Sequence, residues 1–484
     1  MKREALQQIK QKYGNRATDS RFECSLYSRD LASIPSFIVN PLFNTMPDLV
    51  VRPTSAEEVA EILKVVYTSD IPVTPRAGAS TAYFGSIPIK GGVVIDLNLI
   101  DGVVGLNETE MTVTIKAGTT WSDLDEYLSP KGFSSKSFPS SAPVATVGGW
   151  FCMKGYGIGS LKYGSLLSQV KAIEVVLPGG EIRRCSRDSE PPLDWFFASE
   201  GTLGVITEVE LEVRKLNPMK HFLMQCPDVS EMAKILAAVK DAKIPPYNLH
   251  FADQQCVRRL HKLGFSPGQI EAGCLLAIDY EGTVEELTQA QEIMAALIID
   301  HPKMGPLPEE TAKTEWTEIF MALRLKRGGP SILGGEVWLP IRELVGYLAD
   351  IQKMAARYNL EVLSYGHVVT PQHATVMTIF YADEKRTVDY IINFGLIKKI
   401  YDVGSRHRGY PYGVGLWNTP YIGRIFSPMR LADLRKRKKK LDPKGLMNPG
   451  KVYRWPFMMN PLHFGLAMGI MAGLARLIGR GGRR

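Results

Sequence analysis

The feature that most constrains this chain is a loop of small residues between two apolar segments. Residues 71–74 are β-prone and stop at Pro75, and a second apolar run covers residues 91–97. The loop between them is rich in alanine, glycine, serine and threonine, which lets consecutive backbone N–H groups converge without obstruction from side chains. Such a turn predicts an anion site with pyrophosphate as its usual guest, although taken alone the segment is more often a plain connection between strands.

Three later motifs share this composition. Residues 146–149 (Thr-Val-Gly-Gly) follow a stretch of prolines and serines, and residues 163–164 (Tyr-Gly) close a glycine-rich run. Residues 199–207 (Ser-Glu-Gly-Thr-Leu-Gly-Val-Ile-Thr) lead into an apolar strand, and residues 442–451 end in Asn-Pro-Gly-Lys. Small residues allow a close approach of the backbone to a ligand, so the repeated composition favours a bound cofactor over a set of unrelated loops.

In this order the motifs resemble those of the vanillyl-alcohol-oxidase-type flavoproteins, most closely the branch of D-lactate, glycolate and D-2-hydroxyglutarate dehydrogenases. The family's first motif is Pro-Arg-Gly-Gly-Gly-Thr-Ser, where this chain has Pro-Arg-Ala-Gly-Ala-Ser-Thr over residues 75–81. The resemblance covers roughly residues 45–453. It implies a bound FAD more specifically than it implies any one substrate.

The resemblance implies an α+β fold. We expect a two-lobed FAD-binding domain of the p-cresol-methylhydroxylase (PCMH) type, then an α+β cap domain with an antiparallel sheet, and a C-terminal segment that returns to the FAD domain. The expected domains are an N-terminal lead-in, the FAD domain, the substrate cap, the returning segment and a tail, over residues 1–47, 48–215, 216–425, 426–453 and 454–484. Within the lead-in, residues 1–14 are expected to form a short helix and residues 15–47 to be irregular. Local patterns agree with this scheme, since Ser55 and Glu58 predict a capping box at a helix start and alternation over residues 111–116 predicts a strand.

The resemblance also assigns residues to the FAD. The pyrophosphate is expected on the first loop, the isoalloxazine and ribityl chain along the second motif, and the adenine side on the third. The expected residues are Pro75, Arg76, Ala77, Gly78, Ala79, Ser80, Thr81, Pro139, Thr146, Gly148, Gly149, Ser160, Tyr163, Gly164, Glu200, Gly201, Gly204, Ile206 and Asn448. The alternative for each hydroxyl is a local bond within a turn or strand. Non-covalent binding is expected because the first loop has no histidine, and Cys152 is expected to be a buried structural cysteine.

Oxidation of a 2-hydroxy acid requires a cation for the carboxylate and a base for the hydroxyl proton. Arg324 and then Arg327 are the expected carboxylate contacts, because they follow Trp316 in a stretch that loosely resembles the family's cap helix. The alternative is a solvated arginine at the end of a helix.

The base is expected from two later stretches where the family pattern is altered. Metal-dependent members carry Gly-His-x-Gly-Asp-x-Asn-x-His and a later Glu-His-Gly, whereas this chain has only His367 and His373 from the first motif. Aligning the second motif places Tyr412 at the base histidine and Pro411 at the glutamate. The even separation of the two histidines predicts one face of a strand, and all three side chains are expected at the substrate. For His367 the alternative is a structural histidine bonded to the backbone. Two imidazoles without a carboxylate are an incomplete ligand set, so a divalent metal is not favoured.

Charge and cysteine content narrow the partners. The net charge of +8 is concentrated in residues 435–440 and 480–484, without interleaved aromatics, so nucleic acid is not an expected partner. The first of these runs is expected to be a solvated helix face. Six cysteines without a Cys-x-x-Cys pair fit free thiols in a reducing compartment, and the N-terminus lacks the apolar core of a secretion signal. A cytoplasmic location is expected, with peripheral attachment to the cytoplasmic membrane as an extension.

The C-terminal tail is the segment that suggests attachment to the membrane. Gly465, Gly469 and Gly473 recur every fourth residue in an apolar segment that ends in arginines. An interfacial helix on a membrane surface, a helix in a partner's groove and packing against the chain's own domain are the three interpretations.

The sequence therefore predicts an FAD-dependent dehydrogenase of a 2-hydroxy acid or related alcohol, with hydride transfer to flavin N5. Its electrons would pass to a quinone, an iron–sulfur subunit or a flavoprotein. The alternatives are an FAD-dependent oxidoreductase of a sugar-derived or lipid-linked alcohol and a non-catalytic FAD-containing electron-transfer subunit.

Overall fold

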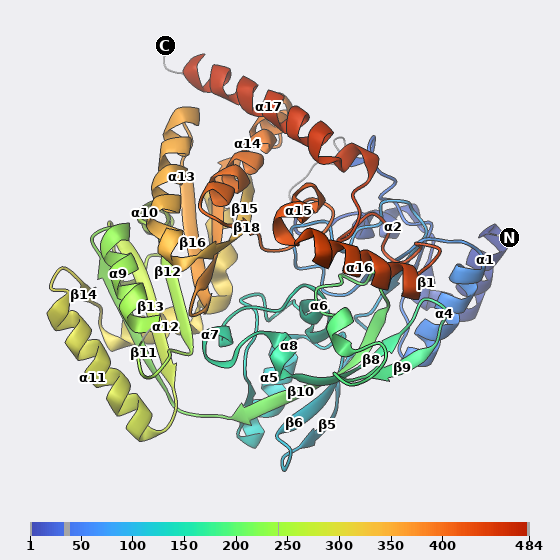
Figure 1. Cartoon of the computed structure of the whole chain (residues 1–484), viewed down its shortest axis with the longest axis horizontal. Helices are drawn as coiled ribbons and strands as arrows, with labels where there is room; N and C mark the ends of the chain where they lie inside the picture. Colours follow the sequence, from blue (N-terminus) through green and yellow to red (C-terminus); the bar gives the residue numbers. More distant parts are fainter. Residues whose placement is uncertain (1, 33–38, 241, 482–484) are drawn as a thin grey trace. The chain divides into compact units, whose positions relative to one another are not determined.

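The computed structural model describes residues 2–32, 39–240 and 242–481, and the chain divides into two compact units (Figure 1). Unit 1 contains residues 1–155, 165–216 and 413–461. Unit 2 contains residues 156–164, 217–412 and 462–484. The polypeptide therefore makes a short excursion into unit 2 before it builds most of that unit.

The first sheet of unit 1 has the order β1-β2-β4-β3. Two of its three strand pairs, β2 with β4 and β3 with β4, are parallel. Its strands are β1 (Ala17–Thr18), β2 (Leu49–Val51), β3 (Val73–Arg76) and β4 (Val93–Asp96). The helices beside it are α1 (Lys2–Tyr13), α2 (Arg21–Tyr27) and α4 (Ala56–Thr68). One face of α4 is apolar and is buried against β-strand side chains, as a 3.6-residue period requires. The lead-in is not irregular throughout, because it contains α2 and β1, while residues 33–38 lie outside the described residues.

The capping box predicted at α4 is half wrong. Ser55 Oγ accepts the N–H of Glu58 at 3.3 Å, as predicted. The Glu58 carboxylate instead accepts the N–H of Thr54 at 2.7 Å and pairs with both terminal nitrogens of Arg16. A bidentate pair with a guanidinium outcompetes the single bond from the N–H of the capping residue.

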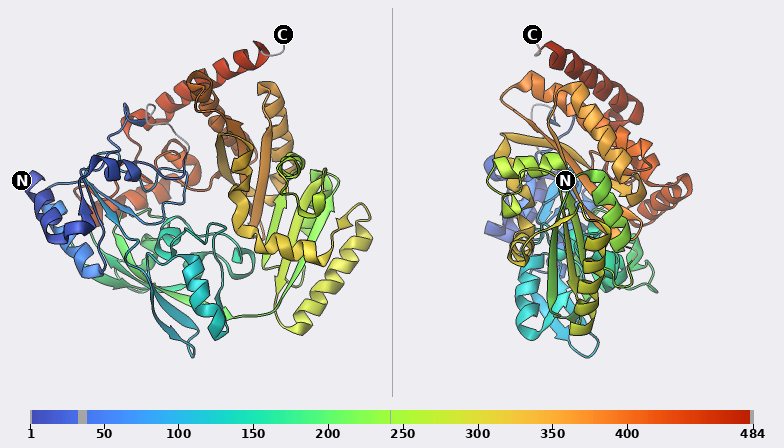
Figure 2. Two further views of the ribbon diagram at one scale, coloured as in Figure 1. Left: turned by 180° about the vertical axis from the view of Figure 1, so that it is seen from behind. Right: turned by 90° about the vertical axis from the view of Figure 1, so that its left-hand side faces the viewer.

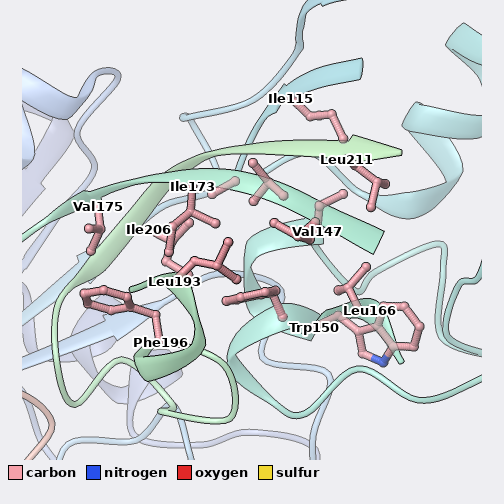
Figure 3. Close-up of a cluster of buried hydrophobic side chains, with 14 of the residues drawn as sticks. Ile115, Val147, Trp150, Leu166, Ile173, Val175, Leu193, Phe196, Ile206 and Leu211 are labelled. Atoms are coloured by element: carbon pink, nitrogen blue, oxygen red, sulfur yellow. The ribbon is translucent and has the colours of Figure 1, made fainter. Parts of the chain in front are cut away.

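The second sheet of unit 1 is antiparallel and has the order β5-β6-β10-β8-β9, with β7 paired to β10. Its strands are β5 (Val103–Asn107), β6 (Thr112–Lys116), β7 (Phe133–Ser135), β8 (Val170–Val176), β9 (Ile182–Cys185) and β10 (Val205–Lys215). The accompanying helices are α5 (Trp121–Leu128), α6 (Val147–Cys152), α8 (Leu166–Gln169), α15 (Ile422–Ile425) and α16 (Pro428–Leu441). Figure 3 shows Val147 and Trp150 of α6 packed with Ile173 and Ile206 of the sheet, which fixes the glycine-containing start of α6 on a rigid base.

Unit 2 is built on an eight-stranded antiparallel sheet, which confirms the predicted cap architecture. Its order is β14-β11-β13-β12-β16-β17-β15-β18. The strands are β11 (Met219–Cys226), β12 (Asn248–Ala252), β13 (Cys274–Glu281), β14 (Gly305–Pro306), β15 (Ser331–Pro340), β16 (Val362–Thr370), β17 (His373–Ala382) and β18 (Tyr410–Pro411). The helices are α7 (Ser160–Tyr163), α9 (Val229–Lys240), α10 (Gln254–Lys262), α11 (Val284–Asp300), α12 (Glu309–Thr317), the 3-10 segment η5 (Ile319–Gly328), α13 (Leu344–Tyr358), α14 (Thr387–Arg406) and α17 (Pro461–Gly481).

Helices α13 and α14 mark one face of this sheet. Tyr347 of α13 hydrogen-bonds Thr378 of β17 at 2.8 Å, and Gly335 of β15 lies directly under the ring of Tyr401 of α14. Because side chains alternate across a strand, Thr375 of β17 points to the other face. That other face carries the polar side chains considered below.

Helix α17 is apolar on two faces, one buried and one exposed. Phe464, Met468 and Ala472 are buried, and the helix packs against α14 at Gly395 (Figures 1 and 2). A second row, Leu462, Leu466, Ile470 and Leu474, is exposed. Within the described residues, no helix reaches the length and hydropathy needed to span a membrane. The end of the basic tail, residues 482–484, lies outside the described residues.

Candidate functional site

The first loop leaves the C-terminal end of β3 as the sequence predicts. No hydrogen bond joins the backbone N–H groups of residues 77–81 to any other described residue, so these donors are available to an anion. Ala79 has a left-handed φ of 47°, which turns the loop without glycine at that position. Gly78 needs its missing side chain, because a Cβ there would lie 1.9 Å from the carbonyl oxygen of Val144. The second motif therefore packs directly on the first.

The third and fourth motifs close on the same loop. A Cβ at Gly201 would contact the ring of Pro75 at 3.0 Å. Asn448 donates its backbone N–H to Val73 O at 2.7 Å and its side-chain amide to Gly85 O at 2.9 Å and to Glu200 O at 2.6 Å. The first, third and fourth motifs thus meet within unit 1 around the end of β3, together with the part of the second motif at residues 146–149.

Lys451, the last residue of the fourth motif, stabilises this arrangement, although it is not among the residues expected to contact FAD. Its buried ammonium donates to Gly85 O at 2.9 Å, to Asn448 Oδ1 at 2.8 Å and to Ile87 O. Burial lowers the pKa of Lys451 to about 7, against the raising effect of Glu200. Fixed carbonyl dipoles hold the cation where a solvent shell would otherwise be needed.

Glu200 is the buried counterpart of Lys451. Its Oε1 accepts the N–H of Gly415 at 2.8 Å, whereas its buried Oε2 has no hydrogen-bond partner among the described residues. Burial raises the pKa of Glu200 to about 7, while the backbone donors and Lys451 lower it. Glu200 is also held at a left-handed φ of 51°. The motif therefore carries both backbone strain and an unsatisfied carboxylate oxygen, as functional sites often do.

The remaining expected FAD residues of unit 1 lie on its second sheet and α6. Thr146 caps α6 by accepting the N–H of Gly149 at 3.2 Å, and Gly148 lies against Ala117. Ile206 is buried on β10, Gly204 lies against β8, and the carbonyl of Pro139 accepts the N–H of Ala142 at 3.0 Å. The six cysteines are free, and burial raises the pKa of Cys152 to about 12, which leaves it a protonated thiol.

These features fit an FAD. Free N–H groups at residues 77–81 suit a pyrophosphate, and the glycine-lined start of α6 suits a flat ring system brought close to the backbone. The residues that would hold the cofactor are therefore the loop, α6 and the Glu200–Ile206 segment.

Three residues expected at the flavin belong to unit 2. Ser160, Tyr163 and Gly164 lie in the excursion 156–164. Ser160 Oγ accepts the N–H of Gly157 at 2.9 Å, and the hydroxyl of Tyr163 donates to the Glu281 carboxylate. The excursion is also fixed by Lys162, whose ammonium donates to Glu281 O at 2.9 Å.

A pair of histidines lies at the centre of the sheet face opposite α13 and α14. His367 of β16 is directly opposite His250 of β12 on one side and Thr375 of β17 on the other. The two imidazoles stack with centroids 4.9 Å apart and planes inclined by 23°. His250 could not be found from the sequence, because only the strand register places it beside His367.

Burial favours the neutral form of both imidazoles. Burial lowers the pKa of His367 to about 4, and burial, then His367, then the charge of Arg324 hold the pKa of His250 well below its usual range. His367 Nδ1 is buried and has no hydrogen-bond partner among the described residues. A neutral imidazole with an unengaged nitrogen is able to accept a proton.

Arg324 reaches the same face from η5. Its Nη2 donates to Glu315 at 3.1 and 3.3 Å, and its Nη1 donates to Glu318 at 2.5 Å. Trp316, next to Glu315, stacks on His221 at 5.3 Å, and His221 Nδ1 lies 2.7 Å from Asp279. Arg327 is instead exposed, with its guanidinium 5.2 Å from the ring centroid of Phe265. Of the two expected carboxylate contacts, only Arg324 lies with the histidines.

Tyr412 and His373 lie along the same face near Trp338. The hydroxyl of Tyr412 donates to Tyr156 O at 3.1 Å and accepts the N–H of Tyr156 at 3.0 Å. Burial raises the pKa of Tyr412, then Glu336 raises it further. The ring of Trp338 stacks on Tyr412 at 6.2 Å and on His373 at 5.3 Å. Tyr412 thus anchors the 156–164 excursion to unit 2.

The prediction that His367 and His373 share one strand is wrong. β16 ends at Thr370 and β17 begins at His373, so the two histidines flank a hairpin turn. Within the part of the chain that the structure describes, no group of three His, Cys, Asp or Glu side chains is placed to bind a metal ion.

The basic run 435–440 is not simply a solvated helix face. Lys438 points inward and donates to Thr202 O at 2.6 Å, to Met447 O at 2.7 Å and to Asp442. The guanidinium of Arg437 lies 5.1 Å from the centroid of the Trp195 ring. This helix therefore joins the third motif to the fourth, because its long side chains reach the carbonyls of both.

Comparison with known proteins agrees with this geometry. Residues 47–186 match the model of an FAD binding domain, and residues 218–452 match the model of the C-terminal domain of FAD linked oxidases. The glycolate oxidase subunit GlcD of Bacillus subtilis is 26% identical over 435 residues, covering 86% of this chain and 91% of that protein. The mitochondrial D-lactate dehydrogenase (cytochrome) of Arabidopsis thaliana is 27% identical over 421 residues, covering 84% of this chain and 73% of that protein.

Solved structures support the fold. A structure of p-cresol methylhydroxylase with substrate bound aligns with a TM-score of 0.78 at 15% sequence identity, covering 94% of this chain and 97% of that one.

Proposed function

Because the chain belongs to the FAD-linked oxidases, flavoproteins of the vanillyl-alcohol-oxidase type, we propose that it is an FAD-dependent dehydrogenase of a 2-hydroxy acid. The names of its relatives, a glycolate oxidase subunit and a D-lactate dehydrogenase, support this substrate class. The observation that carries the proposal is the grouping of Arg324, His250 and His367 on one face of the unit 2 sheet.

The cofactor side follows from unit 1. The backbone N–H groups of residues 77–81 hold the pyrophosphate, and Gly148 and Gly149 give the ring system its close approach to α6. When bound, FAD supplies the acceptor, at flavin N5, for the hydride that leaves the substrate carbon. Binding is non-covalent in this proposal, because residues 75–81 contain neither histidine nor cysteine and the raised pKa of the half-buried Cys152 keeps its thiol protonated.

The substrate side follows from unit 2. Arg324 binds the carboxylate of the substrate and so orients its hydroxyl-bearing carbon. The unengaged Nδ1 of His367 accepts the hydroxyl proton as the hydride leaves. Tyr412 acts as a positioning residue. Its hydroxyl is engaged by the backbone of Tyr156, and its raised pKa keeps the phenol protonated, so it does not serve as the proton acceptor. No divalent metal takes part in this scheme.

Anaerobic reduction of the flavin tests the proposal. D-lactate, glycolate and D-2-hydroxyglutarate, each mixed with the holoenzyme, are expected to bleach the flavin absorbance, whereas their methyl esters bleach it far more slowly. Arg324→Met should raise the KM for the acid about 100-fold, since a charge-assisted bidentate contact contributes about 3 kcal/mol. Arg327→Met, a matched loss of charge outside the face, is the control. An equal effect of both variants would remove Arg324 from the substrate site.

An uncharged alcohol, sugar-derived or lipid-linked, is the second candidate substrate. It is favoured by the two carboxylates already bound to Arg324, which neutralise the cation that an acid requires. Bleaching by such alcohols but by none of the acids would support it. If no substrate reduces the flavin while dithionite does, the chain is a non-catalytic electron-transfer subunit.

We further propose that the electrons pass to a membrane or protein acceptor, and that α17 brings the enzyme to an anionic membrane surface. Leu462, Leu466, Ile470 and Leu474 form an exposed apolar row, and residues 461–484 contain four arginines and no acidic residue. Flotation with phosphatidylglycerol vesicles tests this, and Leu466→Ser with Ile470→Ser should abolish it. Binding that persists in this double variant would exclude α17 as the anchor.

A further inference from the structure

The two carboxylates bound to Arg324 are not equivalent. Glu315 places both of its oxygens within 3.3 Å of Nη2, and its side chain is only 13% exposed. Glu318 makes a single contact, with Nη1, and its side chain is 41% exposed. The side chain of Arg324 is 8% exposed. Glu315 is therefore a built-in support for Arg324, whereas Glu318 binds it from the solvent side.

Glu318 stands in the place that a substrate carboxylate needs. A guanidinium offers its donors in one plane, and Glu315 and Glu318 already occupy both of its terminal nitrogens. A third carboxylate at Arg324 would stand beside two like charges on a single cation, which is electrostatically unfavourable. The substrate therefore enters most readily by exchange, one carboxylate leaving as another arrives.

We propose that Glu318 is a resident carboxylate that a substrate's carboxylate must displace from Arg324, so that Glu318 sets the selectivity among anionic substrates. This inference rests on the proposed function, since it requires Arg324 to bind the substrate's carboxylate. The exchange leaves the number of ion pairs at Arg324 unchanged. Only a substrate whose other contacts exceed those of Glu318 is retained, which disfavours small carboxylates that have nothing else to offer.

The position of Glu318 in the chain suits this exchange. It lies at the junction where α12 ends at Thr317 and η5 begins at Ile319, so its side chain can leave Arg324 without unwinding either element. Glu315 lies inside α12, and burial raises its pKa while Arg324 lowers it. A half-exposed ion pair contributes little stability, so its loss to a competing carboxylate is easily offset.

Glu318→Gln in the full-length holoenzyme is the direct test. The substitution removes the competing charge but keeps the shape of the side chain. The KM of the acid that reduces the wild-type flavin should fall about tenfold, in line with the removal of one like charge from the binding point. The KM of its methyl ester, which has no carboxylate, should be unaltered. Acetate should also become a better competitive inhibitor by a similar factor.

Glu310→Gln is the matched control, because Glu310 is an exposed glutamate at the start of the neighbouring helix α12, where it pairs with Lys313. It should leave all these constants at their wild-type values. If the acid reduces the flavin and its KM is the same or higher in Glu318→Gln, the exchange is refuted while the proposed function stands. If no acid reduces the flavin in either protein, and acetate does not bind, both ideas fall together. An equal fall in KM with Glu310→Gln would show a general charge effect and would overturn the specific role of Glu318.

Discussion

Two sites of buried charge, one in each unit, are held in different ways. In unit 1, Lys451 is tied to the backbone of Gly85 and Ile87, and Glu200 to the backbone of Gly415. In unit 2, Arg324 is tied to the side chains of Glu315 and Glu318. A backbone group does not change when a sequence changes, whereas a side-chain partner is lost by a single substitution.

This difference explains why one half of the function is legible in the sequence and the other is not. A cofactor site made of main-chain groups requires small residues at fixed spacing, and that spacing survives as a motif. A substrate site made of paired side chains can be rebuilt with new partners, and it leaves no fixed pattern. The following predictions would break or sharpen this contrast, from the largest expected effect to the smallest.

Gly78→Ala should abolish FAD binding. The added Cβ would lie 1.9 Å from the carbonyl oxygen of Val144, so the backbone of the loop must move away from the second motif. The flavin-to-protein ratio of the purified variant should fall close to zero, with the far-ultraviolet circular dichroism retained. Gly105→Ala, at a site where a Cβ would meet no atom within 4 Å, is the control and should keep its flavin. A fully loaded Gly78→Ala protein would contradict a backbone-built cofactor site.

His367→Gln should slow flavin reduction by about 10²- to 10⁴-fold, the usual contribution of a general base. The FAD should remain bound, because the substitution lies in unit 2. Stopped-flow reduction under anaerobic conditions measures the effect. Tyr412→Phe is the comparison, and it should slow reduction less than about tenfold, because the proposal gives its hydroxyl a positioning role only. A larger loss in Tyr412→Phe than in His367→Gln would reverse the two roles.

Lys451→Met should destabilise the protein by about 3–5 kcal/mol, because it leaves Glu200 as an uncompensated buried charge. Urea unfolding followed by flavin release measures the loss. The double variant Lys451→Met with Glu200→Gln should recover part of that stability, since the stranded charge is then removed. Lys440→Met, which removes an exposed pair with Glu190, should change stability by less than about 1 kcal/mol. No recovery in the double variant would show that the two charges act independently.

The smallest expected effect is a pH dependence of stability. The pKa of His367 is about 4 in the folded protein and about 6.5 in an unfolded chain, so the unfolded state binds more protons between these values. Stability therefore rises with pH through this window and is lost as the pH falls. His367→Gln removes this contribution, so its Tm should decrease less than the wild-type Tm between pH 6.5 and 4.5. His463→Gln, at an exposed position on α17, should keep the wild-type decrease, and equal slopes in all three proteins would exclude His367 as the cause.

Much of the architecture could be predicted from the sequence. The resemblance indicated the fold class and the antiparallel sheet of unit 2, and local patterns indicated α4 and the strand at residues 112–116. The errors have a common physical source. Glu58 left its predicted capping bond for Arg16, 42 residues away in sequence, and Lys438 left the solvent for carbonyls of two distant motifs.

The residues of the candidate site also divide into those that the local sequence identifies and those that depend on contacts between distant segments. The residues of the first loop could be named in advance, although their contacts with a cofactor stay a prediction. His250 and Glu318 could not be named, because the first depends on the register of β12 against β16 and the second on the break between α12 and η5. Spacing along a chain does not encode either one.

The excursion of residues 156–164 has a consequence for how such proteins diversify. Tyr156 and Lys162 bond to Tyr412 and to Glu281, yet the codons for these partners lie far apart in the gene. A recombination event that exchanged only residues 217–412 between two relatives would join a donor's sheet to the recipient's excursion. The residues that must be inherited together to build this sheet and its excursion are therefore discontinuous in the gene. Chimeras should fold best when residues 156–164 and 217–412 come from one parent.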